Sequence, residues 1–219
     1  MNLLFPRRAV CMACGRMTGH TRDDVCEDCR AALAQNFIGA LGPMPALGVD
    51  FACAAHPYPG PAGGLVRSLK YGGVAILARR MGADLARAAA LMRMPEGTRV
   101  AFVPMHPKRL RRRGRNHAEL LARALAAEMG LECVELLART RNAPQQARLE
   151  TAERRRNLRG GFAVRPEWAR RVCGERILLV DDVLTTGATA ESCAKALKAA
   201  GAKRVYLAVY AHGGQKKKK

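Results

Sequence analysis

Two kinds of hydrophobic pattern alternate along the chain. Short blocks of consecutive apolar residues are typical of strands buried on both faces, and they predict strands at residues 50–57, 99–104, 132–137, 162–164, 177–180 and 204–210. Longer stretches with apolar residues at helical spacing predict helices at residues 65–69, 74–94, 116–129 and 190–200. This order predicts an α/β fold, with a mainly parallel sheet and helices on both faces.

The first 45 residues lack this alternation and contain four of the eight cysteines. The stretch 39–48, G-A-L-G-P-M-P-A-L-G, is typical of a linker because Gly and Pro interrupt regular structure. We therefore expect a small module at residues 1–45, a larger domain at residues 46–212 and a tail at residues 213–219. The tail ends in four lysines, and a run of like charges predicts disorder.

Two C-x-x-C pairs form the first candidate site. Cys11 and Cys14 are followed by eleven residues and then by Cys26 and Cys29, and a short helix is expected at residues 30–37. This spacing lets four thiolates bind one tetrahedral Zn²⁺, which would be structural because a closed four-sulfur site has no position for water. The alternatives are two disulfides, which a reducing cytosol disfavours, or a redox-active C-x-x-C.

The sequence shows neither a secretory signal nor a membrane-spanning run. The start, M-N-L-L-F-P-R-R-A-V, has no apolar region after a basic segment, and no apolar run reaches the length of a transmembrane helix. We therefore expect a cytoplasmic protein without a membrane span. The scattered cysteines lie in apolar contexts and are predicted to be buried thiols: Cys53, Cys133, Cys173 and Cys193.

The second candidate site is the segment 176–189, R-I-L-L-V-D-D-V-L-T-T-G-A-T. An apolar strand runs into Asp181 and Asp182, and a turn of threonines and glycine then leads into a helix. Free N–H groups at the start of a helix favour an anion such as phosphate, and carboxylates accept hydrogen bonds from hydroxyls. The segment therefore predicts a sugar-phosphate site. The alternative is an ordinary strand-to-helix turn with solvated acids.

The net charge of +20, from 38 basic and 18 acidic residues, favours polyanionic partners. Six cations lie in residues 108–115, after a predicted strand, so this basic loop is expected to face the same crevice as the acids. The alternative is a solvated loop. His106 is interpreted as a site contact or a cap, and Lys70 as a solvated cation at a helix end. Aromatics make up only 5%, which gives little support for a base-stacking platform.

Several segments carry a family resemblance. The segment 176–189 resembles the motif by which type I phosphoribosyltransferases bind phosphoribosyl pyrophosphate (PRPP). The double C-x-x-C, the stretch L-K-Y-G at 69–72, the basic segment 104–122 and the polar segment 141–162 complete the pattern. Together they resemble the ComF family of competence and DNA-uptake proteins, which implies a type I phosphoribosyltransferase fold with an N-terminal four-cysteine zinc module. The glutaminase half of the related amidophosphoribosyltransferases is missing from this chain.

The resemblance implies a set of site residues. Asp181 and Asp182 would be catalytic and would meet the ribose hydroxyls, and Arg141 would belong to a flexible loop that closes over PRPP. Mg²⁺ would be held mainly by the ligand's pyrophosphate. The pyrophosphate loop would include Met105, His106 and Lys108. The phosphate-binding turn would be formed by Leu184, Thr185, Thr186, Gly187, Ala188 and Thr189.

Two functions follow as hypotheses. The chain would bind PRPP with Mg²⁺ and also single-stranded DNA, and would act with the DNA-uptake machinery in natural transformation. The alternative is an active phosphoribosyltransferase that uses an unidentified acceptor. Stacking on Phe37, Phe51 or Tyr58 is less favoured than core packing of these rings. The residues expected to contact DNA phosphates are Arg111, Arg112, Arg113 and Arg115.

Overall fold

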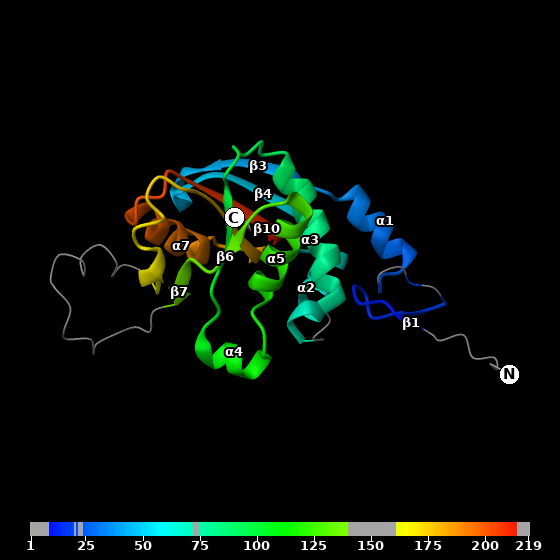
Figure 1. Ribbon diagram of the computed structural model, residues 1–219. Helices are drawn as coiled ribbons and strands as arrows, with labels where there is room; N and C mark the ends of the chain where they lie inside the picture. Colours follow the sequence, from blue (N-terminus) through cyan, green and yellow to red (C-terminus); the bar gives the residue numbers. More distant parts are fainter. Residues whose placement is uncertain (1–8, 20, 22–23, 72–74, 140–160, 214–219) are drawn as a thin grey trace, which may run out of the picture.

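The computed structural model describes residues 9–19, 21, 24–71, 75–139 and 161–213. The predictions for Arg141 and for most of the basic tail fall outside these ranges. Within them the chain forms one six-stranded sheet with helices packed around it, and a small cysteine-containing module lies beside the sheet domain (Figure 1).

The central sheet is mainly parallel, as predicted. Its strand order is β3-β4-β10-β9-β5-β6. Only the edge strand β3 runs antiparallel to its neighbour β4, and the other pairs are parallel. The strands are β3 (Gly39–Met44), β4 (Val49–Pro57), β5 (Arg99–Phe102), β6 (Cys133–Val134), β9 (Arg176–Leu184) and β10 (Arg204–His212).

Two short antiparallel pairs lie outside this sheet. One joins β1 (Ala9–Val10) to β2 (Met17–Thr18) in the cysteine module. The other joins β7 (Leu137–Arg139) to β8 (Phe162–Val164) and thereby brackets the residues that are not described. The predicted strand at residues 132–137 is thus divided between β6 and β7.

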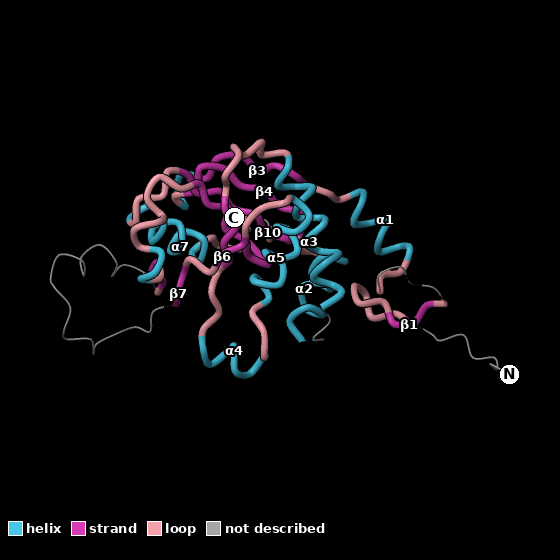
Figure 2. Tube along the Cα trace, in the orientation of Figure 1, coloured by secondary structure: helices cyan, strands magenta, loops and turns pink. Residues whose placement is uncertain are grey.

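Helices cover both faces of the sheet. On one face, α3 (Ala75–Ala90) and α5 (His117–Met129) pack against each other and against β4, β10, β9 and β5, and α7 (Ala188–Ala199) packs on β9 and β10 from the other. Helix α1 (Glu27–Gln35) belongs to the cysteine module and contacts α2 (Pro61–Tyr71). Helix α4 (Pro107–Arg113) lies at the end of two loop segments that project from the sheet (Figure 2). The short 3₁₀ helices are η1 (Pro45–Leu47) and η2 (Pro166–Trp168).

The core confirms the hydrophobic pattern. Ile177, Leu178, Leu179 and Val180 of β9 are all fully buried, as expected for a strand covered on both faces. The strand continues through the two acids to Leu184, which the apolar pattern alone did not predict. The main-chain pairing of Asp181 with Val209 of β10 keeps this polar segment in the sheet.

The predicted linker at residues 39–48 is wrong. These residues form β3 and η1, and β3 pairs with β4 through irregular register between Ala40 and Met44. Edge strands tolerate Pro and Gly because one side of the strand needs no partner, and this explains why a linker-like composition forms a strand here. The division of the chain after residue 45 stays a prediction.

Three further expectations need correction. Helix α2 begins at Pro61 rather than Leu65, which suits a residue without an N–H group at the first helical position. The expected basic loop contains the helix α4, with Gly114 as its left-handed C-cap. Of the four thiols expected to be buried, Cys53 and Cys193 are buried, whereas Cys133 is half-buried and Cys173 is exposed.

Candidate functional site

The two acids of β9 have different surroundings. Consecutive residues of a strand point to opposite faces of the sheet, and Asp181 and Asp182 follow this rule. Asp182 contacts Lys70 at the end of α2. The charge of Asp181 acts on the thiol of Cys193 on α7, where it helps burial to raise the pKa of that thiol. The two carboxyl groups therefore differ in their partners and in their charge state.

Asp182 forms an ion pair that joins two distant parts of the sequence. Its Oδ2 lies 2.9 Å from the Nζ of Lys70, and the two side chains are only 16% and 24% exposed. Partial burial strengthens such a pair relative to one at the surface. The interpretation of Lys70 as a solvated cation is therefore wrong. The stretch L-K-Y-G was a signal for this contact, but its spacing did not show which acid the lysine would meet.

Asp181 is held as a weak acid. Its Oδ1 accepts a hydrogen bond of 2.8 Å from the backbone N–H of Asp182. Burial raises the pKa of Asp181 to about 8, and the negative charge of Asp182 adds to this effect, while the hydrogen bond and the charge of Lys70 oppose it. A raised pKa of this kind is frequent in binding and catalytic sites.

The turn after β9 leads into α7 through a left-handed glycine. Gly187 has φ +82°, and a Cβ there would lie 2.7 Å from the Leu47 side chain, so only glycine fits well. Thr186 Oγ1 accepts a weak, 3.5 Å hydrogen bond from the N–H of Ala188. Leu184 and Gly187 are buried, whereas the other residues of the turn are exposed: Thr185, Thr186, Ala188 and Thr189. The geometry suits an anion at the start of α7.

The segment after β5 reaches the same end of the sheet. The N–H of Val103 donates to the carbonyl of Val180, one residue before the acids. His106 is the N-cap of α4, and its Nδ1 accepts from the N–H of Lys108 at 3.1 Å, which supports the capping interpretation. Met105 and His106 are half-buried, and Lys108 is exposed. The structure thus places these residues on α4 and its approach, beside β9.

Helix α4 presents a row of arginines. Arg111, Arg112 and, after the helix, Arg115 are exposed. The guanidinium of Arg113 lies 5.2 Å from the ring centre of Tyr71 and donates to its hydroxyl at 3.4 Å. Tyr71 is 74% exposed and directly follows Lys70 in α2. An exposed aromatic ring therefore lies between the arginine helix and the acid site, and the sequence analysis did not select it.

His117, at the start of α5, is a second residue that the sequence analysis missed. Its side chain is buried, at 3% exposure, and its Nδ1 has no hydrogen-bond partner among the described residues. Burial lowers the pKa of His117, and the charge of Arg113 lowers it further, while the charge of Asp182 and a hydrogen bond with the Lys70 backbone oppose these effects. The imidazole therefore lies close to the ion pair in its neutral form.

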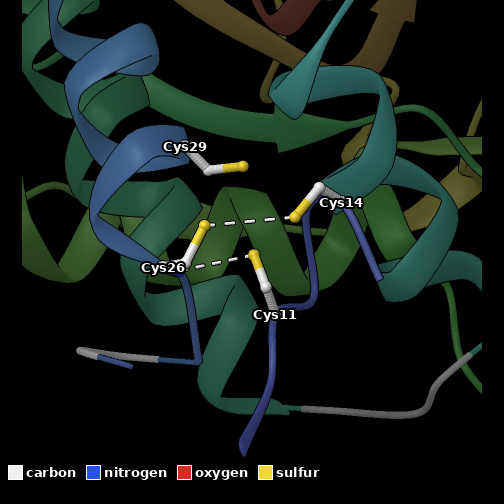
Figure 3. A group of neighbouring side chains, drawn as sticks. All are labelled: Cys11, Cys14, Cys26 and Cys29. Carbon is white, nitrogen blue, oxygen red and sulfur yellow. Dashed lines mark hydrogen bonds between the residues drawn. The ribbon is translucent and has the colours of Figure 1, made fainter. Parts of the chain in front are cut away.

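The four cysteines of the N-terminal module converge on one point. Their Sγ atoms all lie within 4.8 Å of one another (Figure 3). Cys14 and Cys26 Sγ are 4.0 Å apart, and the N–H of Cys26 donates to Cys11 Sγ at 3.3 Å. A tetrahedral ion with metal–sulfur bonds of about 2.3 Å requires sulfur atoms about 3.8 Å apart. The cluster could therefore hold a metal with little adjustment.

The state of the cysteines also fits metal binding. All eight carry free thiols, so neither C-x-x-C pair forms a disulfide. Hydrogen bonding from the Arg16 side chain lowers the pKa of Cys14 to about 6, and the thiolate is the form that binds metal. Arg16 also pairs with Asp28 of α1 at 2.8 Å, which ties the two halves of the module together.

No helix in the described ranges is both long and apolar enough to cross a membrane.

The chain is similar to several known proteins. A family model described as a phosphoribosyl transferase domain matches residues 111–219, which include both acids and the turn. DNA utilization protein YhgH of Salmonella typhi is 32% identical over 157 residues, or 68% of this chain and 66% of that protein. The protein of the same name from Escherichia coli K12 is 28% identical over 218 residues, or 94% of this chain and 92% of the relative.

Competence protein F of Haemophilus influenzae is 30% identical over 120 residues, or 53% of this chain and 50% of that protein. The match thus spans about half of that relative. Among solved structures, the glutamine PRPP amidotransferase of B. subtilis, complexed with ADP and GMP, is 22% identical, with a TM-score of 0.42. The match covers 59% of this chain and 25% of the amidotransferase.

Proposed function

This chain belongs to the ComF family of competence and DNA-uptake proteins, and we propose that it binds PRPP with Mg²⁺ and also binds single-stranded DNA. The observation that carries the first half is the acid pair of β9, with Lys70 held against Asp182 and an exposed hydroxyl turn beside it. This arrangement combines acceptors for a diol with a cation and N–H donors for phosphate groups.

In this proposal, each polar part of PRPP contacts a different group of the site. The ribose hydroxyls donate to the carboxylates of Asp182 and Asp181, and the 5′-phosphate lies at the turn from Leu184 to Thr189 at the start of α7. The pyrophosphate extends toward Lys70 and the basic segment from Met105 to Lys108. On ligand binding, Lys70 can exchange its contact with Asp182 for a phosphate oxygen, which leaves Asp182 free to accept from the ribose. Arg141, outside the described residues, is proposed to close over the ligand.

Mg²⁺ arrives with the ligand in this proposal. Among the described residues, the cysteine cluster is the only group of three or more side chains gathered as metal ligands. A protein site without its own oxygen cage fits Mg²⁺, which commonly binds through substrate phosphates and water. The four cysteines are proposed to hold a structural Zn²⁺, because their thiols lie close together and soft sulfur ligands favour this ion.

A transfer reaction is the second candidate function, and the raised pKa of Asp181 and the neutral His117 favour it. The bond between C1 of ribose and the pyrophosphate oxygen breaks, and pyrophosphate leaves with the electron pair. A lone pair of the acceptor forms the new bond to C1, and the acceptor then loses a proton to water. The carboxylate of Asp182 favours positive charge on the ribose, so catalysis rests on positioning and electrostatics.

The DNA half of the proposal rests on α4 and Tyr71. Arginines along a projecting helix can bind successive phosphates in a salt-dependent way. Tyr71 is exposed and held by Arg113, so it can stack on a base, and every base offers a face for stacking. The exposed ring of Tyr71 is therefore a better candidate for stacking than Phe37, Phe51 and Tyr58, whose rings are partly buried against the core. We place this activity in DNA uptake during transformation, in contact with the uptake machinery in the cytoplasm.

Calorimetric titration with PRPP and Mg²⁺ tests the proposal. We expect saturable binding by the wild type and no measurable binding by the double variant Asp181→Asn, Asp182→Asn, because each amide keeps only one acceptor oxygen, adds a donor and carries no negative charge. Circular dichroism controls for folding, and retained DNA binding shows that the variant is otherwise intact. Pyrophosphate release, screened over bases and amines, then separates a transferase from a PRPP-binding protein. Equal binding by the variant would refute the assignment of the site.

A further inference from the structure

The cysteine module makes an unusually close contact with helix α2. Gly64 of α2 faces the C-x-x-C loop so closely that an added Cβ would lie 1.7 Å from the carbonyl oxygen of Ala13. Ala13 lies between the two metal-ligand candidates Cys11 and Cys14. A side chain at position 64 would therefore require the loop or the helix to move.

A hydrogen bond fixes the same two segments one helical turn further along. Ser68 Oγ donates to the carbonyl of Met12 at 2.6 Å, in a half-buried position. Residues four apart lie on the same face of a helix, so Gly64 and Ser68 together form the surface of α2 that receives the C-x-x-C loop. The apolar side chains of the same helix are buried in the core: Leu65, Val66 and Leu69.

The same helix supplies Lys70 to the acid site. Lys70 follows Ser68 by two residues in the last turn of α2, and its Nζ lies 2.9 Å from Asp182 Oδ2. The C-x-x-C loop is therefore linked to Asp182 through α2, which contacts the loop at Ser68 and the acid at Lys70. A shift of α2 along its axis would break the ion pair before it disturbed β9, which is held on both sides by main-chain pairing with β10 and β5.

We propose that the metal-bound cysteine module is a brace for the PRPP site: it positions α2 through Gly64 and Ser68, so that Lys70 is held at the acid site, within reach of both Asp182 and the ligand. This inference rests on the proposed function of the acid site. Ser68 and Gly64 are positioning residues, because they act through Lys70 and touch no ligand. The module thus positions a helix of the sheet domain, in addition to any contact that it makes with DNA.

The residues of the module fit this task when a metal is bound. Met12 and Ala13 lie inside the loop that Cys11 and Cys14 would close around the ion, so a bound metal fixes the two carbonyl groups that α2 receives. Without a metal, a module of this size has too small a core to hold this loop in place. Metal occupancy is therefore expected to change the position of α2 and the affinity for PRPP.

A double-mutant cycle on the metal-loaded, full-length chain tests the brace. Ser68→Ala is expected to keep the metal, measured by elemental analysis, and to weaken PRPP binding about three- to tenfold, the range for one lost hydrogen bond. Ser68→Thr, which keeps the hydroxyl, should restore the affinity. In a Lys70→Ala background the same Ser68→Ala change should have less than about a twofold effect, because contacts that act in series are not additive.

Thr98→Ala is the matched control. Thr98 Oγ1 donates to the carbonyl of Pro95 at 2.6 Å, a hydrogen bond of the same kind and length as that of Ser68. It precedes β5 at the amino end of the sheet, and its loss should leave PRPP affinity unchanged. Equal effects of Ser68→Ala with and without Lys70, or an unchanged affinity in metal-loaded Ser68→Ala, would overturn the brace.

Hydrogen exchange gives a second test that needs no PRPP. Removal of the metal from the wild type by a chelator should accelerate exchange of the α2 amides at residues 62–71 as well as those of the module, and leave α3 unchanged. Protection of α2 that is independent of the metal would refute the brace. Absence of PRPP binding in the metal-loaded wild type, with metal-dependent protection of α2, would instead refute the proposed function and retain the mechanical coupling.

Discussion

The cysteine cluster and the acid site are built in contrasting ways. All four cysteines lie between residues 11 and 29, and two short loops suffice to bring their thiols together. The acid site instead joins the end of α2 in the first half of the chain to β9 near its end, with α4 and α5 beside them. We expect the stability of the local site to depend on a bound ion, and that of the dispersed site to depend on the fold.

The largest effect is expected from a change to the local site. Cys26→Ser removes one of four ligands, and structural zinc sites contribute about 10 kcal/mol or more to the stability of such modules. We predict that the variant loses its metal and that residues 9–35 lose protection in hydrogen exchange, while the sheet domain stays folded. A metal-free variant with a protected module would show that the cluster is not a structural metal site.

The second largest effect is expected at Lys70. Lys70→Ala leaves a partly buried carboxylate without its cation and removes a positive charge from the site, so we predict a loss of PRPP affinity of about tenfold or more. Arg67→Ala is the control, because it removes an equal charge from an exposed position of the same helix. Titration calorimetry measures both variants, and similar losses in the two would mean that only the overall charge matters.

The same contrast explains how much of each site could be predicted from the sequence. The spacing of Cys11, Cys14, Cys26 and Cys29 was sufficient to predict a cluster, because the ligands are near neighbours in the chain. The apolar run and the turn likewise identified the acid segment. Lys70, Tyr71 and His117 were missed because their roles depend on how α2, α4 and α5 pack on β9, and no local pattern reports such packing.

The fold shows the same limit. The buried strands and long helices were predicted from periodicity, since burial on both faces leaves a clear signal. The edge strand β3 was mistaken for a linker, and α4 for a loop, because Gly and Pro dominate the first and arginines the second. In β3 the tertiary context outweighs the local composition. In α4 the local sequence favours a helix, because Arg, Lys and Leu are good helix formers and Gly114 ends the helix, so the run of charge was misinterpreted.

A moderate effect on stability is expected at Asp181. Its pKa is about 8 in the folded chain, compared with about 3.9 for an unfolded Asp. Between these values the folded state keeps a proton that the unfolded state releases, so this group's contribution is fully present below about pH 4 and is lost as pH rises to about 8. Asp181→Asn should therefore raise the melting temperature more at pH 8 than at pH 5. The same change in melting temperature at pH 5 and at pH 8 would contradict the raised pKa of Asp181.

The last effect is expected on DNA affinity. Tyr71→Ala should weaken binding to a single-stranded oligonucleotide by about 1–3 kcal/mol, as for other stacking residues, without a change in salt dependence. Arg112→Ala should instead reduce the slope of affinity against salt by about one unit. Fluorescence anisotropy over a range of salt concentrations measures both. A change of slope in Tyr71→Ala, or none in Arg112→Ala, would remove α4 and Tyr71 from the proposed DNA surface.

A crystal structure of the chain with PRPP and Mg²⁺ tests the central claim most directly. We predict the ribose hydroxyls within hydrogen-bond distance of the carboxylates of Asp181 and Asp182, the 5′-phosphate at the start of α7, and Lys70 turned from Asp182 toward pyrophosphate. A ligand bound elsewhere, with the ion pair between Lys70 and Asp182 intact at 2.9 Å, would contradict the account.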